Sequence, residues 1–320
     1  MQMVGESIVT KPNKLLDLLQ NANSISVMAL GIVLGLLLGG KARWIEPLSL
    51  PALTVAMSVS MTGIVASDFR SWRKVAYATV LSIILTFFIQ GGLILVLARP
   101  LVRDVELWLG FVLLAATPPG IAVVPFSYVL EGDAVLALVG YVATYLAAIV
   151  IMPMTAVFLG GSVLIQPMRL LTILVQLVLI PLGVSRLITI SPLKISIERW
   201  SSTIVNWAFA LVIFTAVGLN RDGLLQQSQM LLLIALIGLA SSLGLGLVLE
   251  WILEKLQVNR AVCLSSVLIG TIKNTSLTAA TVLSLFAERV ALPAAVITVT
   301  NALYLIWLGI WWGGQRRRKT

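Results

Sequence analysis

The sequence predicts an all-α membrane protein of ten transmembrane helices, arranged as a 5+5 inverted repeat. Three observations lead to this prediction. Hydrophobic residues make up 59% of the 320 residues and charged residues only 11%, whereas a soluble domain carries about 25% charged residues. Apolar stretches long enough to cross a bilayer recur along the whole chain. Two of these stretches are interrupted by helix-breaking residues about half a chain apart.

Ten apolar stretches are bounded by polar or turn-forming residues, and each is predicted to be one span. In chain order they are 24–40, 48–66, 73–98, 106–131, 133–160, 166–188, 199–219, 229–251, 260–287 and 290–313. The first five form a predicted repeat over 24–160 and the last five a second over 166–314. An N-terminal cytoplasmic segment, 1–23, precedes them, and a basic cytoplasmic tail, 315–320, follows.

The predicted orientation is N-in and C-in. An even number of spans puts both chain ends on one side, and the tail QRRRKT marks that side as cytoplasmic. Inside segments then hold 14 Lys and Arg residues and outside loops hold 7, with Lys273 inside a span. This bias explains the net charge of +9 without a nucleic-acid partner. We expect an integral protein of a lipid bilayer, in a prokaryotic inner (cytoplasmic) membrane, without a cleaved signal peptide.

The residue types present limit the chemistry. The chain has no histidine, which removes the commonest metal ligand and the usual proton carrier at neutral pH. Cys263 is the single cysteine, so an intrachain disulfide cannot form. We therefore expect no metal site and no cofactor.

Two landmarks indicate the same internal repeat. Asp68, in MTGIVASDFRSW, and Asp222, in FTAVGLNRDG, are 154 residues apart. The same offset of 154 maps Pro119 onto Lys273. Five spans in each half is an odd number, so the two halves would face opposite ways across the membrane. Sequence identity between the halves is negligible, and chance spacing of similar spans is the alternative explanation.

The fourth and ninth spans carry the interruptions. In the fourth, Pro118 and Pro119 remove successive backbone donors and Gly120 adds conformational freedom. The ninth contains the polar run GTIKNTS. Non-helical backbone inside a bilayer is tolerated only where protein or a wet cavity satisfies it, and the ends of half-helices attract ions. The two interruptions therefore predict one shared binding site near the midplane.

Lys273 is the most informative single residue. A charged side chain at bilayer depth is costly and usually functional. None of the thirteen carboxylates falls at the predicted midplane, so Lys273 has no evident acidic partner. The alternative is a lysine near a helix end that extends its ammonium to the interface. Its place opposite the TPPG interruption argues against that alternative.

Three strings resemble the bile acid/sodium symporter family, within the wider bile acid, arsenite and auxin carrier-like group. They are MSVSMTGIVASDFR, TPPGIAVVPFSYVLEGDAVLALV and IGTIKNTSLTAATVLSLFAERVALPAAVITVTNAL. The resemblance is specific at P-x-G-x-A followed by Y-x-x-x-G-D, and at N-x-x-L followed by ALPAA. It implies a panel domain (spans 1, 2, 6 and 7) and a core domain (spans 3–5 and 8–10), with the broken spans crossing in the core. Family members move organic anions, often with sodium.

The chain resembles a divergent member that lacks the usual sodium ligands. The family places oxygen-bearing side chains at six positions that are occupied here by Val123, Val124, Ala137, Tyr141, Ile269 and Lys273. Valine, alanine and isoleucine side chains offer no oxygen to a hard cation. Asn274 and Asn301 match places where the family contacts its substrate.

Three roles for Lys273 are open. Its ammonium stands permanently where relatives bind sodium, it binds an anionic substrate directly, or it gains and loses a proton during the cycle. We expect a secondary transporter of a small organic anion, working by alternating access without sodium. The expected substrate-binding residues are Pro119, Gly120, Lys273, Asn274, Thr275 and Asn301.

Other classes fit the sequence less well. An intramembrane enzyme would need zinc-binding histidines or paired aspartates; a serine–lysine pair involving Lys273 is the one remaining arrangement, and we predict no enzyme. A sodium- or proton-coupled symporter with a different ion site, or a passive uniporter, stays open. A sensor is weakly supported, because the short loops leave no room for a signalling domain.

Overall fold

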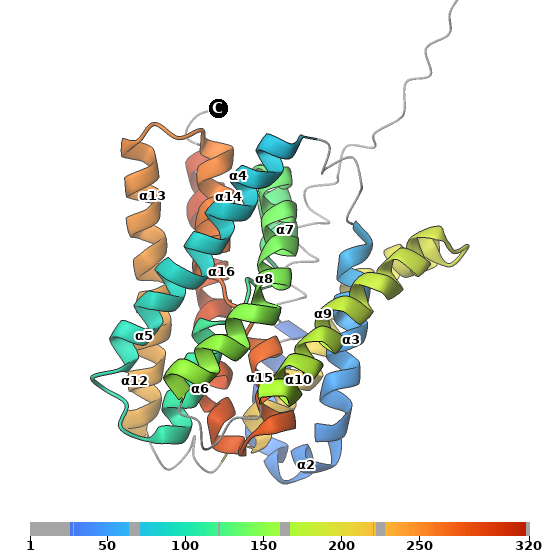
Figure 1. The fold of residues 1–320 in the computed structure, drawn as a ribbon, viewed down its shortest axis with the longest axis vertical. Coiled ribbons are helices and arrows are strands. Elements are labelled where there is room, and N and C mark those ends of the chain that lie inside the picture. The colour runs from blue at the N-terminus through green and yellow to red at the C-terminus, as the bar shows by residue number, and fades with distance from the viewer. Residues whose placement is uncertain are drawn as a thin grey trace, which may run out of the picture.

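The computed structural model describes residues 26–27, 29–63, 71–120, 122–160, 167–219, 221 and 228–317. These residues are helical apart from short connections, and they contain no β-strand (Figure 1). The predicted all-α class is therefore confirmed. The N-terminal segment 1–23, residues 318–320 of the tail, and the repeat landmarks Asp68 and Asp222 lie outside the described residues.

The first group of elements consists of short helices. It comprises a helix over residues 29–38, η1 (Gly39–Lys41), α2 (Ala42–Ile45), η2 (Glu46–Leu48), α3 (Ser49–Ser60) and η3 (Met61–Gly63). The elements that follow are α4 (Trp72–Ile83), η5 (Ile84–Gly91), α5 (Gly92–Ala98), α6 (Val105–Ala115), α7 (Val123–Val129), α8 (Ala134–Gly160) and α9 (Pro167–Ile190). The last group is α10 (Lys194–Leu219), α12 (Ser228–Leu239), η6 (Ala240–Gly244), α13 (Leu245–Lys255), α14 (Arg260–Thr271), α15 (Thr275–Leu285), η7 (Glu288–Ala291) and α16 (Leu292–Arg317).

Several of these elements join end to end into two similar rods. α4, η5 and α5 run without a break over residues 72–98, and α12, η6 and α13 do so over 228–255. The central segment of each rod is π-helical, an uncommon geometry that is frequent at functional sites. Each rod is followed by a helix that stops and restarts, and then by a long helix, α8 or α16.

Among the described residues, four helices are long and apolar enough to cross a membrane, judged by length and composition. They are Trp72–Ala98, Val135–Gly160, Gln229–Lys255 and Glu288–Gly309. α10 makes a fifth if its two parts count as one span despite a bend of 53° between them. Each of the ten predicted ranges contains helix, but ten spans and the inverted repeat stay predictions.

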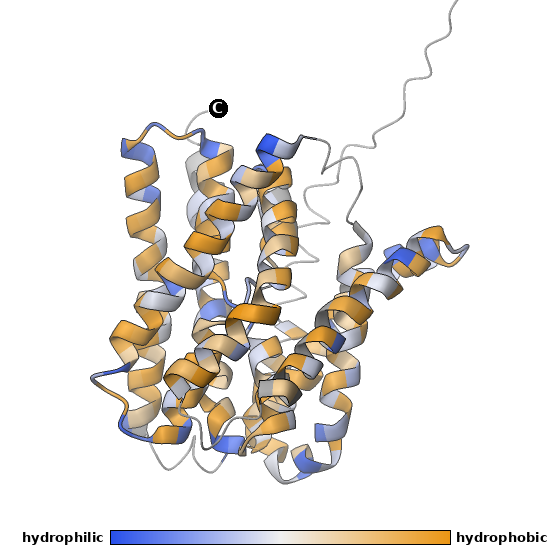
Figure 2. Ribbon diagram, viewed as in Figure 1, coloured by the Kyte–Doolittle hydropathy of each residue, from blue (hydrophilic) through white to orange (hydrophobic). Residues whose placement is uncertain are grey.

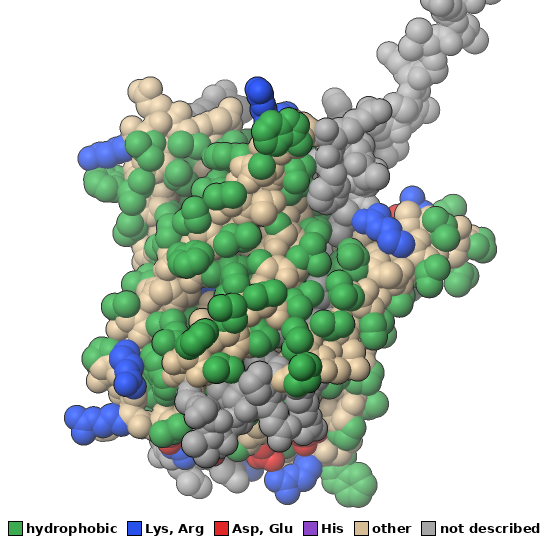
Figure 3. All heavy atoms as spheres, in the orientation of Figure 1, with side chains coloured by type: hydrophobic (Ala, Val, Ile, Leu, Met, Phe, Trp, Pro, Cys, Tyr) green, Lys and Arg blue, Asp and Glu red, His purple; other side chains and the backbone are tan. Residues whose placement is uncertain are grey.

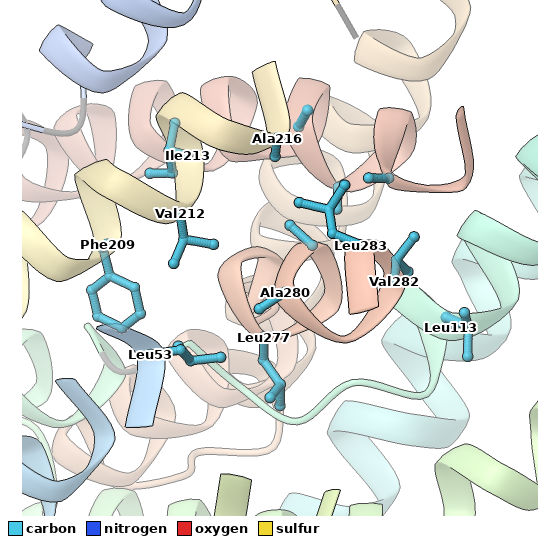
Figure 4. Close-up of a cluster of buried hydrophobic side chains, with 14 of the residues drawn as sticks. Leu53, Leu113, Phe209, Val212, Ile213, Ala216, Leu277, Ala280, Val282 and Leu283 are labelled. Atoms are coloured by element: carbon cyan, nitrogen blue, oxygen red, sulfur yellow. The ribbon is translucent and has the colours of Figure 1, made fainter. Parts of the chain in front are cut away.

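The helices around the candidate site pack in two groups. α3 packs against α9 and α10, whereas α4 packs against α8 and α12 packs against α16. The helix 29–38 lies close to α10, where a Cβ on Gly31 would come within 2.6 Å of the Ala210 carbonyl oxygen. The groups share an apolar cluster in which Leu53 of α3 and Phe209 of α10 lie near Leu277 of α15 (Figure 4). This cluster holds α15, which begins at the candidate site.

The surface separates hydrophobic from charged residues. Figure 2 shows hydrophobic residues along the helices and hydrophilic residues gathered toward the two ends of the molecule. On the face drawn in Figure 3, hydrophobic side chains cover the middle, and Lys and Arg side chains lie toward the ends. Trp44, Trp72 and Trp251 are exposed near helix ends, as interfacial anchors are. This surface is consistent with an integral membrane protein.

Candidate functional site at the crossing of two broken helices

The two interrupted helices meet at their breaks. α6 ends at Ala115 before α7 begins at Val123, and α14 ends at Thr271 before α15 begins at Thr275, so both predicted interruptions are confirmed. Pro119 and Lys273, the pair related by the offset of 154, lie opposite each other in an antiparallel bridge.

Two backbone hydrogen bonds close this bridge. The Gly120 N–H donates to the Ile272 carbonyl oxygen at 3.0 Å, and the Asn274 N–H donates to the Pro118 carbonyl oxygen at 2.9 Å. Unpaired backbone groups are costly inside a bilayer. Each break therefore supplies hydrogen-bond partners to the other, which explains why non-helical backbone is stable in the buried interior.

The proline pair also frees carbonyl oxygens at the end of α6. In a continuous helix the N–H of residue 119 would donate to the carbonyl oxygen of Ala115, but proline has no N–H. The chain turns instead, and the Thr117 N–H donates to the Leu114 carbonyl oxygen at 3.1 Å. The Ala115 carbonyl oxygen thus needs another donor, and the Thr117 carbonyl oxygen lies just beyond the end of α6, where the partial negative charge of a helix C-terminus favours a cation.

Lys273 is that donor. Its Nζ donates to the carbonyl oxygens of Thr86, Ala115 and Thr117 at 2.8, 2.8 and 2.9 Å. The residue is 3% exposed, so its ammonium is held at the crossing and does not extend to an interface. The Phe87 ring lies beside it, with 5.3 Å between Nζ and the ring centroid. A lysine ammonium has three N–H groups, and all three are used.

The π-helical segment η5 supplies the third acceptor. In such a segment a carbonyl oxygen pairs with the N–H five residues along the chain rather than four, which changes the direction of the backbone groups. Gly91 lets η5 approach α6, because a Cβ there would lie 2.6 Å from the Ala115 carbonyl oxygen. The Thr86 hydroxyl also donates to the Ile269 carbonyl oxygen at 3.3 Å, so Thr86 contacts the second broken helix through both its carbonyl oxygen and its hydroxyl.

Side chains from the two long helices bind the opposite side of the crossing. The Tyr145 hydroxyl of α8 donates to the Pro119 carbonyl oxygen at 3.1 Å, and it accepts from Asn274 Nδ2 at 2.5 Å. Asn301 of α16 donates from Nδ2 to the Lys273 carbonyl oxygen at 3.4 Å. The two bridged residues are therefore each contacted by the long helix of their own half, with the closer contact at Pro119.

Further hydroxyl and amide groups order the start of α15. Asn274 Oδ1 accepts from the Leu277 N–H at 2.9 Å, which caps the helix. The Thr298 hydroxyl donates to the Thr275 hydroxyl at 2.7 Å. These bonds fix α15 relative to α16.

The six expected substrate-binding residues are all buried. Five of them meet at the crossing through the bonds described above: Pro119, Gly120, Lys273, Asn274 and Asn301. Thr275 adjoins them. In this structure Lys273 has no N–H left for a substrate, so the geometry favours the role of a permanent cation over direct anion binding.

The other expected former ion-site positions are apolar or otherwise engaged. Val123, Ala137 and Ile269 are buried, and Val124 is partly buried against the apolar cluster of Figure 4. Tyr141 packs against Tyr145, with 4.3 Å between ring centroids and the rings tilted by 40°. Its hydroxyl points to the Met57 sulfur at 3.8 Å.

Sequence reasoning missed four contributors to the site. Three of them act through backbone carbonyl oxygens, which carry no residue signature: Thr86, Ala115 and Thr117. The proline pair is the signal that could have located the carbonyl of Ala115. Tyr145 lies one helical turn after Tyr141, and a buried tyrosine usually finds a hydrogen-bond partner.

The fold and the site define an all-helical protein, consistent with an integral membrane protein, in which two broken helices cross beside a buried ammonium. A comparison with protein-family models finds no match for this chain, and no curated protein matches its sequence.

Proposed function

We propose that the protein is a secondary transporter of a small organic anion that works by alternating access and does not couple to sodium. The Lys273 ammonium takes the place of a bound sodium ion and holds the crossing together. The protein is proposed to lie in a prokaryotic inner membrane with both ends in the cytoplasm.

One observation carries this proposal: an ammonium surrounded by three carbonyl oxygens at the end of a broken helix. Carbonyl oxygens and half-helix C-termini are the groups that bind alkali cations in transporters. Here a tethered cation already occupies such a set, and Val123, Ala137 and Ile269 offer no side-chain oxygens for a metal ion.

The order of elements supports a ten-helix inverted repeat as the scaffold. Each half of the chain contains a rod with a π-helical centre, then a broken helix, then a long helix. The bridge between Pro119 and Lys273 joins positions related by the repeat offset. Broken helices at corresponding places in two halves are typical of transporters whose substrate site lies between them.

The proposal is tested by uptake into proteoliposomes. A thermal-shift screen with small carboxylates and sulfonates selects the anion, and its uptake is then compared in sodium, potassium and choline. We expect equal rates in the three cations. A steep requirement for sodium would reject the uncoupled mechanism, and absence of uptake above protein-free liposomes for every stabilising anion would reject transport.

A further inference from the structure

Lys273 places one unbalanced positive charge at the crossing. The three oxygens around its Nζ belong to neutral carbonyl groups, and the Phe87 ring carries no net charge. Three described carboxylates pair with other cations: Glu288 with Arg43, Glu198 with Lys194 and Asp104 with Arg289. Carbonyl dipoles and an aromatic face stabilise an ammonium without cancelling its charge.

The three short contacts favour the charged form of this amine. A neutral amine has two hydrogens and a lone pair, and the lone pair would face one of the three acceptors. The three N–O distances, 2.8, 2.8 and 2.9 Å, are all those of hydrogen bonds. Three donated hydrogen bonds need the three hydrogens of an ammonium.

A fixed charge at this depth is sensitive to membrane potential. When access alternates, a group at the crossing is connected first to one aqueous phase and then to the other. Moving one elementary charge between the two phases is work against the transmembrane field. This work is needed only when the ammonium crosses the field without an accompanying opposite charge.

We propose that Lys273 is a fixed counter-charge, so that the carrier is electroneutral when loaded with a monovalent anion and carries one positive charge when empty. This inference rests on the proposed function and specifies its substrate class as anions with a single negative charge. Exchange of one such anion for another is then insensitive to membrane potential. Return of the empty, cationic carrier to the outside is opposed by an inside-negative potential, so exchange and export are favoured over net uptake.

The test compares the wild type with Lys273→Arg, which keeps the charge, and Lys273→Met, which removes it. In planar bilayers without any anion substrate, voltage steps are applied and the displaced charge is integrated. In proteoliposomes, exchange of radiolabelled pyruvate, a monocarboxylate, and isethionate, a monosulfonate, is measured at zero potential and at about 100 mV inside-negative. Protein-free liposomes give the background.

We expect the wild type and Lys273→Arg to displace up to about one elementary charge per molecule, and Lys273→Met to displace none. Exchange by the wild type should have the same rate at both potentials. If Lys273→Met does not fold, the charge displaced by the wild type still tests whether the empty carrier is charged.

The outcomes separate this inference from the proposed function. Probe exchange without displaced charge in the wild type, or equal displaced charge in a folded Lys273→Met, would overturn the counter-charge and leave transport intact. Neither displaced charge nor exchange of either probe would overturn the proposed transport as well. Displaced charge without probe exchange would support the counter-charge and remove these two anions as substrates.

Discussion

The two interrupted helices contribute different groups to the same site: the first provides hydrogen-bond acceptors and the second provides the donor. The first interruption is made by Pro118 and Pro119, which remove hydrogen-bond donors and so leave carbonyl oxygens free. The second is made by polar residues and brings a donor, Lys273. All three acceptors of the ammonium, Thr86, Ala115 and Thr117, belong to the first half of the chain, and the cation belongs to the second.

This difference shows how the two broken helices divide the roles within one site. Each half contains a rod, a broken helix and a long helix in that order, but the position opposite Lys273 in the bridge is a proline that cannot donate. A charge can therefore sit on only one side of the crossing. Four experiments test this division into an acceptor half and a donor half.

Removal of the donor should have the largest effect. Lys273→Met leaves three buried carbonyl oxygens without a partner, at about 1–3 kcal/mol each. We expect transport to fall to background and the melting temperature in detergent to fall more than in any other variant. Lys194→Met, which removes a lysine that is exposed in α10, is the matched control and should leave both unchanged. Wild-type stability in Lys273→Met would contradict the role of the ammonium.

Displacement of the carbonyl acceptors should have the second-largest effect. A Cβ on Gly91 would lie 2.6 Å from the Ala115 carbonyl oxygen, so Gly91→Ala must move η5 away from α6. Overpacking of this kind costs about 1–3 kcal/mol, and we expect a lower melting temperature and slower transport. The control is Gly92→Ala, where a Cβ would meet nothing within 4 Å. Equal melting temperatures for the two variants would show that close approach of η5 is not needed.

The side chains that bind the crossing from α8 and α16 should differ in importance. Tyr145→Phe removes a donor to Pro119 and an acceptor from Asn274, and we expect a loss of about 1–2 kcal/mol. Asn301→Leu removes a longer contact, 3.4 Å to the Lys273 carbonyl oxygen, and should cost less. Thermal unfolding of both variants ranks them. Tyr77→Phe serves as the control, since the Tyr77 side chain is exposed on α4, away from the crossing. The reverse ranking would contradict the assignment of Tyr145.

The smallest effect is expected at one end of the molecule, where a surface ion pair joins the two halves. Arg43 and Glu288 are 2.9 Å apart, and both are exposed. The Glu288 carboxylate raises the pKa of the Arg43 guanidinium above its usual value by accepting its hydrogen bond. Reversal of either charge should change transport by less than about fivefold, because exposed pairs contribute little.

The double reversal, Arg43→Glu with Glu288→Arg, should restore the wild-type rate measured in the same uptake assay. A loss of transport in the double variant as severe as that of Lys273→Met would show that this end of the molecule, rather than the crossing, limits the cycle.

Local signals in the sequence located the interruptions but not their partners. The TPPG and GTIKNTS strings predict where α6 and α14 stop, because proline removes donors and polar side chains compete with helical backbone. The surroundings of the Lys273 ammonium were not predictable in this way. Thr86 lies 187 residues from Lys273, and it acts through a backbone group that every residue possesses. Tyr145 was missed for a related reason: the sequence around a tyrosine in an apolar stretch does not show whether its hydroxyl binds a distant carbonyl or water.

The amino-acid sequence alone identifies a helical, largely apolar chain with a lysine inside an apolar stretch and a proline pair half a chain away. Those properties depend on residue type and near neighbours, which a linear string records. Only the folded chain shows that the lysine donates to three carbonyl oxygens of the other half. Hydrogen bonds to backbone groups depend on position and direction in space, and folding brings those groups together only when the two broken helices cross.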